Sequence, residues 1–252
     1  MRTLHIIMPM AGEGSRFKEK GYNIPKPLIE LNGIELYRHA LNSLNMLEID
    51  EFKHTFIVRD EFRDIISKQI LESYPDANIL SVKETTKGAL ETVMLAEDYI
   101  EDDDYVIVMD CDLEFESIDF INELNDAIDT GEPMLLSFYS RDPKYSYVSC
   151  NAYGDVVLIA EKEVISTHAI GGCYCLGRGD LFKKCAKIYI YDFYKGKIKS
   201  PEIYISLIYN YIIKEGIYVS IYDMNFHKDH YWSYGTPYDL EHYNYNKNIW
   251  DN

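Results

Sequence analysis

The residues best suited to chemistry lie between Ile6 and Leu28, a stretch that reads IIMPMAGEGSRFKEKGYNIPKPL. An apolar segment leads into a loop with Gly12 and Gly14. Glycines let backbone N–H groups approach anionic oxygens, and cations neutralise phosphate charge that is costly to desolvate. The stretch therefore predicts a polyphosphate-binding loop, although a surface turn with ordinary basic residues has the same composition. Its cationic side chains are Arg16, Lys18, Lys20 and Lys26.

A second group of candidates follows the apolar segment Tyr105–Met109, in the order Asp110, Cys111, Asp112. Carboxylates at the end of a buried strand are costly unless they meet a cation. Mg²⁺ prefers carboxylate oxygens, keeps several waters and bridges to phosphate, so one or two protein ligands are enough. These residues predict a magnesium site, and Mg²⁺ is the only cofactor that we expect.

Three further patterns are weaker. Lys87–Ala89 is a strand-to-helix turn whose Gly-Ala step could let the backbone lie against a flat ligand, but such turns are common in α/β folds. Glu161-Lys162 ends a predicted strand and would by itself be a surface ion pair. His227, Asp229 and His230 do not match the spacing of a standard metal site, and a structural or exposed role is favoured.

Alternating strands and helices must bring these residues together. Apolar runs predict strands at 3–9, 55–58, 77–82 and 105–109, while apolar residues at helical spacing predict helices at 34–47, 60–73 and 118–128. This alternation predicts an α/β fold with a doubly wound, mostly parallel, Rossmann-like mixed sheet, whose ligands lie at the carboxyl ends of its strands. Later segments predict strands at 133–140, 156–161, 169–176 and 216–222, and helices at 178–190, 203–214 and 237–249.

Composition limits the classes of partner. The 252 residues suit one large domain, and a formal charge of −17 argues against nucleic acid or an anionic membrane. No apolar run is long enough to span a bilayer, and no signal peptide is evident, so we expect a cytoplasmic location. The five cysteines form no C-x-x-C pair and are expected to be free thiols. The 23 tyrosines favour aromatic packing, and a homo-oligomer would have the same composition.

Two well-known phosphate loops are excluded by the residues of the opening stretch. The dinucleotide motif G-x-G-x-x-G needs a glycine where this chain has Phe17, and the P-loop motif G-x-x-x-x-G-K-[ST] does not occur. A dinucleotide-dependent enzyme and a P-loop ATPase are therefore disfavoured.

The chain resembles the sugar-phosphate nucleotidyltransferase family, whose signature is G-x-G-[ST]-R followed by P-K-P-L. Here these are the segments 12–16 and 25–28. The patterns at 87–89, 112 and 161–162 follow in the order of the family's base-contacting loop, metal aspartate and Glu-Lys pair. Gly172-Cys173-Tyr174 and Gly235-Thr236-Pro237 resemble two later motifs. The resemblance implies a GT-A-like fold in a single domain, 1–252, with a nucleotide-binding half at about 1–140 and an acceptor-binding half at about 141–252.

The implied reaction is attack of an acceptor phosphate on the α-phosphorus of a nucleoside triphosphate, with release of pyrophosphate. By resemblance, Arg16 holds the β- and γ-phosphates, Lys26 bridges the two reacting phosphates, and Asp112 holds Mg²⁺. The implied nucleotide-binding residues are Met10, Ala11, Gly12, Glu13, Gly14, Ser15, Arg16, Lys87, Gly88 and Ala89. The implied acceptor-binding residues are Lys26, Glu161, Lys162 and Gly172.

One position departs from the family pattern. Many members have a second metal carboxylate two residues before the late Gly-Thr, where this chain has Ser233; Asp110 and Asp229 are possible substitutes. The P-M-A-G-x-G-S-R-F stretch looks closest to small capsule-cluster enzymes, among them CTP:phosphoglutamine cytidylyltransferases. The alternatives are a sugar-1-phosphate nucleotidyltransferase using UTP, dTTP or GTP, a GT-A glycosyltransferase using Asp110-Cys111-Asp112 as its D-x-D motif, and a nucleotide-sensing module without activity.

Overall fold

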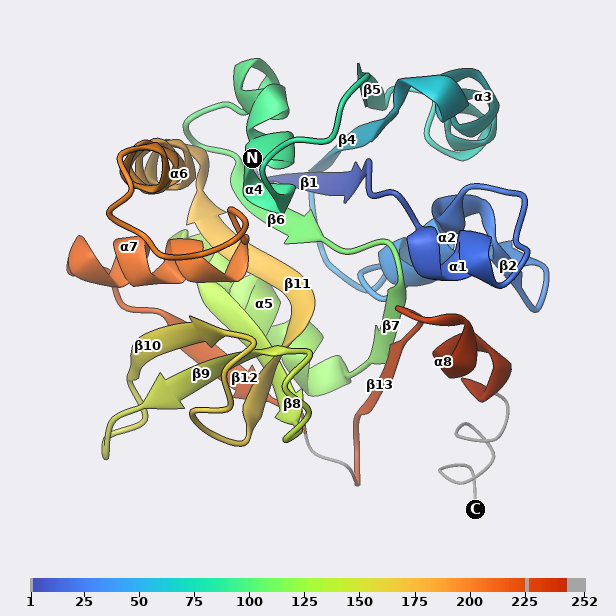
Figure 1. Ribbon diagram of the computed structural model, residues 1–252. Coiled ribbons are helices and arrows are strands. Elements are labelled where there is room, and N and C mark those ends of the chain that lie inside the picture. Colours follow the sequence, from blue (N-terminus) through green and yellow to red (C-terminus); the bar gives the residue numbers. More distant parts are fainter. Residues whose placement is uncertain (1, 225–226, 244–252) are drawn as a thin grey trace.

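The computed structural model of the chain describes residues 2–224 and 227–243. In this part of the chain a sheet of nine strands forms the centre of the molecule (Figure 1). Its strands are β1 (Thr3–Met10), β4 (Glu51–Arg59), β5 (Asn78–Val82), β6 (Tyr105–Met109), β8 (Met134–Tyr139), β9 (Ser146–Cys150), β10 (Val156–Glu161), β11 (His168–Arg178) and β12 (Ser220–Asp223).

The main path of the sheet has the order β10-β9-β11-β6-β1-β4-β5, and β8 lies between β11 and β12. The strands β5, β4, β1 and β6 are parallel, whereas β11 is antiparallel to β6, β8 and β9. The expected α/β fold with a mixed, doubly wound sheet is confirmed. The parallel part comes from the N-terminal half of the chain, and its carboxyl ends lie where the opening loop leaves β1.

Helices cover both faces of the sheet, because its strands are apolar on both sides (Figure 1). On β1, Leu4, Ile6 and Met8 belong to one buried cluster, while Ile7 belongs to the cluster on the other face. The helices of the first face are α2 (Leu36–Asn42), α3 (Arg63–Ser73) and α5 (Ile118–Thr130). Those of the second face are α4 (Ala89–Val93), α6 (Gly179–Tyr194) and α7 (Tyr209–Lys214).

A third, smaller hydrophobic cluster joins the opening loop to the C-terminal segment. It contains Phe17 from α1 (Ser15–Glu19) together with Trp232 from β13 (His230–Ser233) and the buried Tyr234. The strand β13 pairs antiparallel with β7 (Leu113–Glu116), which follows the aspartates at the end of β6. The remaining short elements near the loop are η1 (Lys26–Leu28), β2 (Glu30–Leu31), β3 (Ile34–Glu35) and α8 (Pro237–Glu241).

Several boundaries differ from those expected from sequence. The strands β7, β9 and β13 were not predicted, since each is only four or five residues long and lacks an extended apolar run. The segment predicted as a helix at 34–47 begins as β3, and its helix ends at Asn42. In the helix predicted at 237–249, α8 ends at Glu241, and the part after 243 lies outside the described residues. The 3₁₀ helices besides η1 are η2 (Asp60–Phe62), η3 (Met94–Tyr99) and η4 (Ser206–Ile208).

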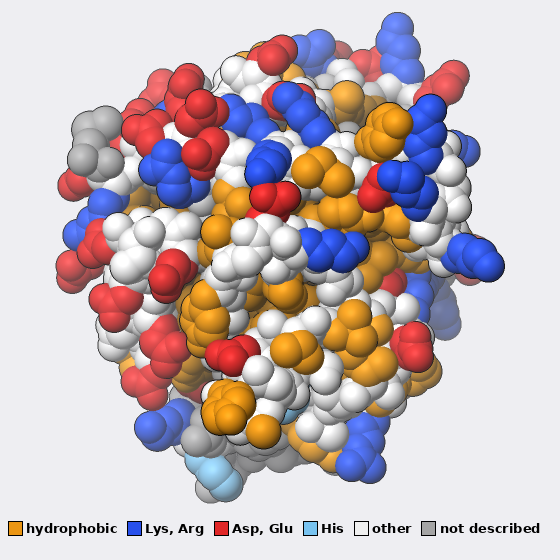
Figure 2. Space-filling view, turned by 90° about the vertical axis from the view of Figure 1, so that its left-hand side faces the viewer, with side chains coloured by type: hydrophobic (Ala, Val, Ile, Leu, Met, Phe, Trp, Pro, Cys, Tyr) orange, Lys and Arg blue, Asp and Glu red, His pale blue; other side chains and the backbone are white. Residues whose placement is uncertain are grey.

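No helix among the described residues is long and apolar enough to cross a membrane. All five cysteines are free thiols, as expected. On the face shown in Figure 2, basic side chains are scattered between acidic and apolar ones, so the described residues of that face form no continuous basic surface.

Candidate active site

The loop after β1 has the open backbone that its glycines predicted. No atom lies within 4 Å of the position that a Cβ on Gly12 would take, and Gly14 has φ +61°, a left-handed conformation that favours glycine. Phe17 is buried two residues after Ser15, which fastens the loop to the third hydrophobic cluster. The exposed side chain of Arg16 is thereby held at the rim of a cavity of about 320 Å³. We call it the loop cavity.

Lys26 lies across the loop cavity from Arg16 and forms an ion pair with Asp112. Its ammonium also lies 5.4 Å from the centre of the Phe17 ring. Asp112 stands in the turn between β6 and β7, and Tyr234 fixes this turn by donating from its backbone N–H to the Asp112 carbonyl at 2.6 Å. Lys26 and Asp112 are 86 residues apart in the chain, and the parallel pairing of β1 with β6 brings them together.

Burial and neighbouring charge shift the pKa values at this strand end. Burial and, after it, the negative charge of Asp112 together raise the pKa of Asp110 to about 7. For Lys26, burial lowers the pKa, but the charge and hydrogen bond of Asp112, with the charges of Cys111 and Asp110, together outweigh burial and hold the pKa above its ordinary value. Lys26 is therefore a cation at neutral pH, and Asp110 is close to its point of half-ionisation.

Two glycines lie close to these carboxylates. Gly172 has φ +38°, and a Cβ there would lie 2.7 Å from Leu113 Cδ2 and 2.8 Å from Asp110 Oδ2. It belongs to an irregular stretch of β11, where the register with β8 shifts between Ile170 and Tyr174. A Cβ on Gly235 would lie 3.5 Å from Asp112 Oδ2. A side chain at position 172 would therefore crowd Asp110, whereas a Cβ at position 235 would make only ordinary van der Waals contact with Asp112.

A second cavity, the Gly88 cavity, has a volume of about 440 Å³ and lies beside the first at the end of β1. Gly88 is held against the segment before η4, because Ile203 donates to the Lys87 carbonyl at 2.9 Å and Leu90 donates to the Ile203 carbonyl at 3.1 Å. A Cβ on Gly88 would lie only 2.4 Å from the Ile203 nitrogen. The cavity shares Pro9 and Gly12 with the loop cavity.

A third cavity, the Glu161 cavity, has a volume of about 260 Å³ and shares Asp110 and Asp112 with the loop cavity. The Glu161 carboxylate accepts hydrogen bonds from two hydroxyls, those of Ser146 and Ser206. These bonds hold the carboxylate in one orientation on the cavity wall. Asp110 and Asp112 therefore stand where a ligand in the loop cavity would meet a ligand in the Glu161 cavity.

The structure brings most of the predicted residues to these three cavities. Glu13 lies beside them, in a small cavity of about 20 Å³ under the loop. Lys162 has φ +55° and donates to the Tyr204 hydroxyl at 2.9 Å, behind the wall that Tyr204 contributes to the Glu161 cavity. The predicted residues that line the loop cavity or the Gly88 cavity are Met10, Ala11, Gly12, Gly14, Ser15, Arg16, Lys26, Lys87, Gly88 and Ala89. Those that line the Glu161 cavity are Asp110, Asp112, Glu161 and Gly172.

Asp229 is not brought to the aspartates of β6. Its buried carboxylate accepts a hydrogen bond from the Tyr222 hydroxyl at 2.8 Å. It precedes β13, whose far end, Ser233, pairs with Leu113 beside Asp112. The length of β13 therefore separates Asp229 from Asp112. A closer carboxylate is that of Asp239, whose Oδ2 lies 4.0 Å from the Cβ position of Gly235.

Sequence reasoning missed several residues of the Glu161 cavity. Period-two alternation along β13 was an available signal, since Trp232 and Tyr234 are buried in the third cluster while Tyr231 and Ser233 line the cavity. Lys144 stands in an unremarkable turn and gave no signal. The missed lining residues with polar side chains are Lys144, Tyr145, Ser146, Tyr204, Ser206, Tyr231 and Ser233.

Comparison with known proteins identifies a family and a similar fold. The family described as the MobA-like NTP transferase domain matches residues 6–171. A nucleoside-diphosphate-sugar pyrophosphorylase from Vibrio cholerae RC9 has a similar fold, with a TM-score of 0.74, 23% identity, and coverage of 94% of this chain and 98% of that one. An inositol-1-phosphate CTP transferase from T. maritima has a TM-score of 0.71 and 17% identity, covering 100% of this chain and 95% of that one. No curated protein matches the chain in sequence.

Proposed function

Because the chain belongs to the MobA-like NTP transferase family and is a nucleotidyltransferase, we propose that it joins the nucleotidyl group of CTP to a small phosphorylated acceptor. The observation that carries this proposal is the position of Asp110 and Asp112 on the boundary between the loop cavity and the Glu161 cavity. Two phosphates, one from each side, would meet at this boundary beside Lys26.

The loop cavity suits the triphosphate. An acceptor phosphate oxygen would attack the α-phosphorus, and the bond from the α-phosphorus to the pyrophosphate oxygen would break. Arg16 would hold the β- and γ-phosphates and stabilise the leaving pyrophosphate. Lys26, now paired with Asp112, would move to the α-phosphate and the acceptor phosphate. Such positioned cations supply most of the acceleration, because phosphoryl chemistry requires little covalent help from the protein.

The other two cavities suit the nucleoside and the acceptor. In the Gly88 cavity, the exposed backbone of Gly12 leaves room for a flat base, while Gly88 lets the chain pack closely against Ile203. In the Glu161 cavity, the oriented carboxylate of Glu161 would accept hydrogen bonds from the acceptor. Lys162 would support this wall through Tyr204, and the acceptor phosphate would lie toward Asp110 and Asp112.

Magnesium fits the oxygen donors at the end of β6. No group of three or more His, Cys, Asp or Glu side chains in the described part of the chain could hold a metal ion, but Mg²⁺ shared with phosphates needs only one or two carboxylates. Asp112 would hold it, with Asp110 as a second candidate. The ion would supply charge neutralisation and orient the phosphates. Asp229 is not part of this proposal, because it lies at the other end of β13.

L-glutamine phosphate is our specific candidate for the acceptor, in the synthesis of capsule or other cell-surface polysaccharide precursors. CTP as donor has some support from fold, since one structurally similar protein is an inositol-1-phosphate CTP transferase. Sugar-1-phosphate nucleotidyl transfer is the alternative, since another is a nucleoside-diphosphate-sugar pyrophosphorylase.

A pyrophosphate-release assay tests the proposal. The protein is incubated with Mg²⁺ and each of CTP, UTP, dTTP and GTP, together with L-glutamine phosphate, glucose 1-phosphate or inositol 1-phosphate. We expect the fastest release with CTP and L-glutamine phosphate, and none after chelation of the metal. Asp112→Asn should abolish release, whereas Asp180→Asn, at an exposed position on α6, should not.

Each result has a separate meaning. Turnover only with a hexose 1-phosphate would contradict the glutamine acceptor and leave the reaction intact. Nucleotide binding without pyrophosphate release from any pair would contradict nucleotidyl transfer and favour a sensing module.

A further inference from the structure

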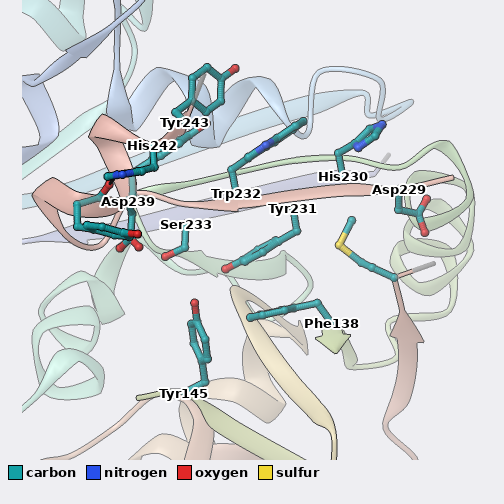
Figure 3. A pocket seen from close by; sticks show the side chains of 13 residues that line it. Phe138, Tyr145, Asp229, His230, Tyr231, Trp232, Ser233, Asp239, His242 and Tyr243 are labelled. Atoms are coloured by element: carbon teal, nitrogen blue, oxygen red, sulfur yellow. Dashed lines mark hydrogen bonds between the residues drawn. The ribbon is translucent and has the colours of Figure 1, made fainter. Parts of the chain in front are cut away.

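A fourth cavity, the aromatic cavity, lies between β13, α8 and the end of β8 (Figure 3). Its volume is about 370 Å³, larger than that of the Glu161 cavity. The ring of Tyr231 stacks on Phe138 with centroids 4.4 Å apart, and Tyr238 stacks on His242 at 4.0 Å. None of the roles proposed for nucleotidyl transfer uses this cavity.

The aromatic cavity adjoins the Glu161 cavity. Tyr145, Tyr231 and Ser233 line both of them, so these three side chains form the boundary between the two. The Tyr145 hydroxyl points toward Ser233 in Figure 3. The small side chain of Ser233 adds no charge to this boundary.

Cationic side chains line the two neighbouring cavities. Arg16 and Lys26 line the loop cavity and Lys144 lines the Glu161 cavity, in each case together with the carboxylates of Asp110 and Asp112. Neither Lys nor Arg is among the described residues that line the aromatic cavity, whereas Asp229 and Asp239 lie toward its two ends. Aromatic rings attract cations through their faces, and carboxylates attract them through charge.

We propose that the aromatic cavity is the subsite for the remote end of the acceptor, and that this end carries an ammonium group. The inference rests on the proposed function, since it needs an acceptor phosphate beside Asp112. One end of the acceptor is then a phosphate held by cations, and the other is an amine held by aromatic rings and Asp239. The acceptor passes between Tyr145 and Tyr231.

Matched acceptors test this subsite. Phosphate monoesters of ω-amino alcohols are prepared in increasing chain length, each paired with the alkyl phosphate of equal length. We expect kcat/KM for the amine to exceed that for its alkyl partner by about tenfold at the chain length that reaches the aromatic cavity, as for other partly desolvated cation–aromatic contacts. Binding of the same pairs, measured by calorimetry without nucleotide or metal, should show the same preference.

Two variants locate the preference. Tyr238→Ala removes a ring that is 67% exposed, so the fold should be retained, and Asp239→Asn removes charge while keeping the oxygen that accepts from Thr236. Each should reduce the amine-to-alkyl ratio toward one. The ratio, rather than the rate, is the readout, because Asp239 lies near Gly235 and Asp112. The matched controls are Tyr153→Ala, which removes a side chain that is 92% exposed, and Asp180→Asn, at an exposed position.

The outcomes separate the two proposals. Pyrophosphate release with equal kcat/KM for both acceptors would overturn the ammonium subsite and leave nucleotidyl transfer standing. A ratio that the Tyr238 and Asp239 variants do not change would also overturn it. If no acceptor released pyrophosphate, the proposal of nucleotidyl transfer would be wrong. Independently of that result, equal calorimetric affinities for the amine and alkyl phosphates would overturn the ammonium subsite.

Discussion

At the scale of residues, Lys26 and Asp112 set the charge where the loop cavity meets the Glu161 cavity. In the ion pair each neutralises the other, so neither charge is buried alone, which would cost several kcal/mol. Binding of a triphosphate with its metal would supply new partners to both. The ion pair thus stabilises the site before the ligands bind. When it breaks, the contacts of both residues with the ligands compensate for its loss.

Arg16 is the residue whose loss should affect turnover without affecting the fold. Its side chain is exposed at the rim of the loop cavity. We expect Arg16→Ala to lower kcat by a factor of roughly 10² to 10³, as for other preorganised charge contacts in a transition state. The measurement is pyrophosphate release, with the thermal midpoint as a check on folding. The control is Lys18→Ala, which removes a nearby exposed cation that does not line the loop cavity and should leave turnover close to that of wild type. An unchanged rate in Arg16→Ala would contradict the role assigned to Arg16.

Gly172 is the residue whose backbone matters most to the aspartates. Gly172→Ala should cost about 1–3 kcal/mol of stability through backbone strain. It should also lower turnover, because the new Cβ would lie 2.8 Å from the present position of Asp110 Oδ2 and would push this atom away. Gly216→Ala is the matched control, with φ +77° and no atom within 4 Å of its Cβ position. Denaturation and steady-state assays on both variants separate strain from displacement. Full activity in Gly172→Ala would show that the position of Asp110 is unimportant.

Among the elements, β7 and β13 do the most to position the site. They pair antiparallel, so Ser233 lies beside Leu113 and the backbone of Tyr234 reaches Asp112. Alternation along β13 sends Trp232 into the third cluster and Tyr231 toward the ligand cavities. One short strand therefore anchors the C-terminal segment and forms part of the wall of the Glu161 cavity.

The strand β4 carries a pH-sensitive residue, His54, which stacks between Phe52 and Phe56. Burial lowers the pKa of His54 from 6.5 to about 4. Between these pH values the unfolded chain takes up a proton that the folded chain does not, so the free energy of unfolding falls as the pH drops from 6.5 toward 4. We expect His54→Phe, which keeps the stacking, to reduce this fall by about 3 kcal/mol. Urea titrations across this pH range measure the free energy of unfolding of both proteins. The same dependence of this free energy on pH in wild type and variant would contradict the prediction.

In the molecule as a whole, the third hydrophobic cluster connects the opening loop to the C-terminal segment. Phe17 of α1 packs there with Trp232 of β13 and Tyr234. The loop cavity has walls from both ends of the chain, including Gly235. Its shape depends on this contact.

Phe17→Ala should therefore affect distant parts of the chain together. We expect it to cost about 3 kcal/mol of stability, to lower turnover by releasing Arg16 and Lys26, and to speed hydrogen exchange at the amides of β13. Phe193→Ala, a partly buried position on α6 at the other face, should leave exchange in β13 unchanged. Equal exchange in β13 for both variants would show that the cluster does not hold the two segments together.

Much of the fold could be predicted because its signals are local. The buried runs of β1 and β6 and the apolar spacing of α3 and α5 depend on neighbouring residues, and their positions agree with expectation. The short strands β7, β9 and β13 could not be predicted, because what stabilises them is pairing with strands that are distant in the chain. Asp229 was expected only as a possible substitute for the metal carboxylate that Ser233 replaces, and the pairing of β13 places it away from Asp112.

The sequence by itself determined the glycine-rich loop and the aspartates after β6, because the glycines, cations and carboxylates stand next to the strands that carry them. Only the tertiary structure decided that Lys26 meets Asp112, that Ser146 and Ser206 orient Glu161, and that an aromatic cavity adjoins the Glu161 cavity. The reason is physical: these contacts join segments that are remote in the chain, and the register of the central sheet sets their distances.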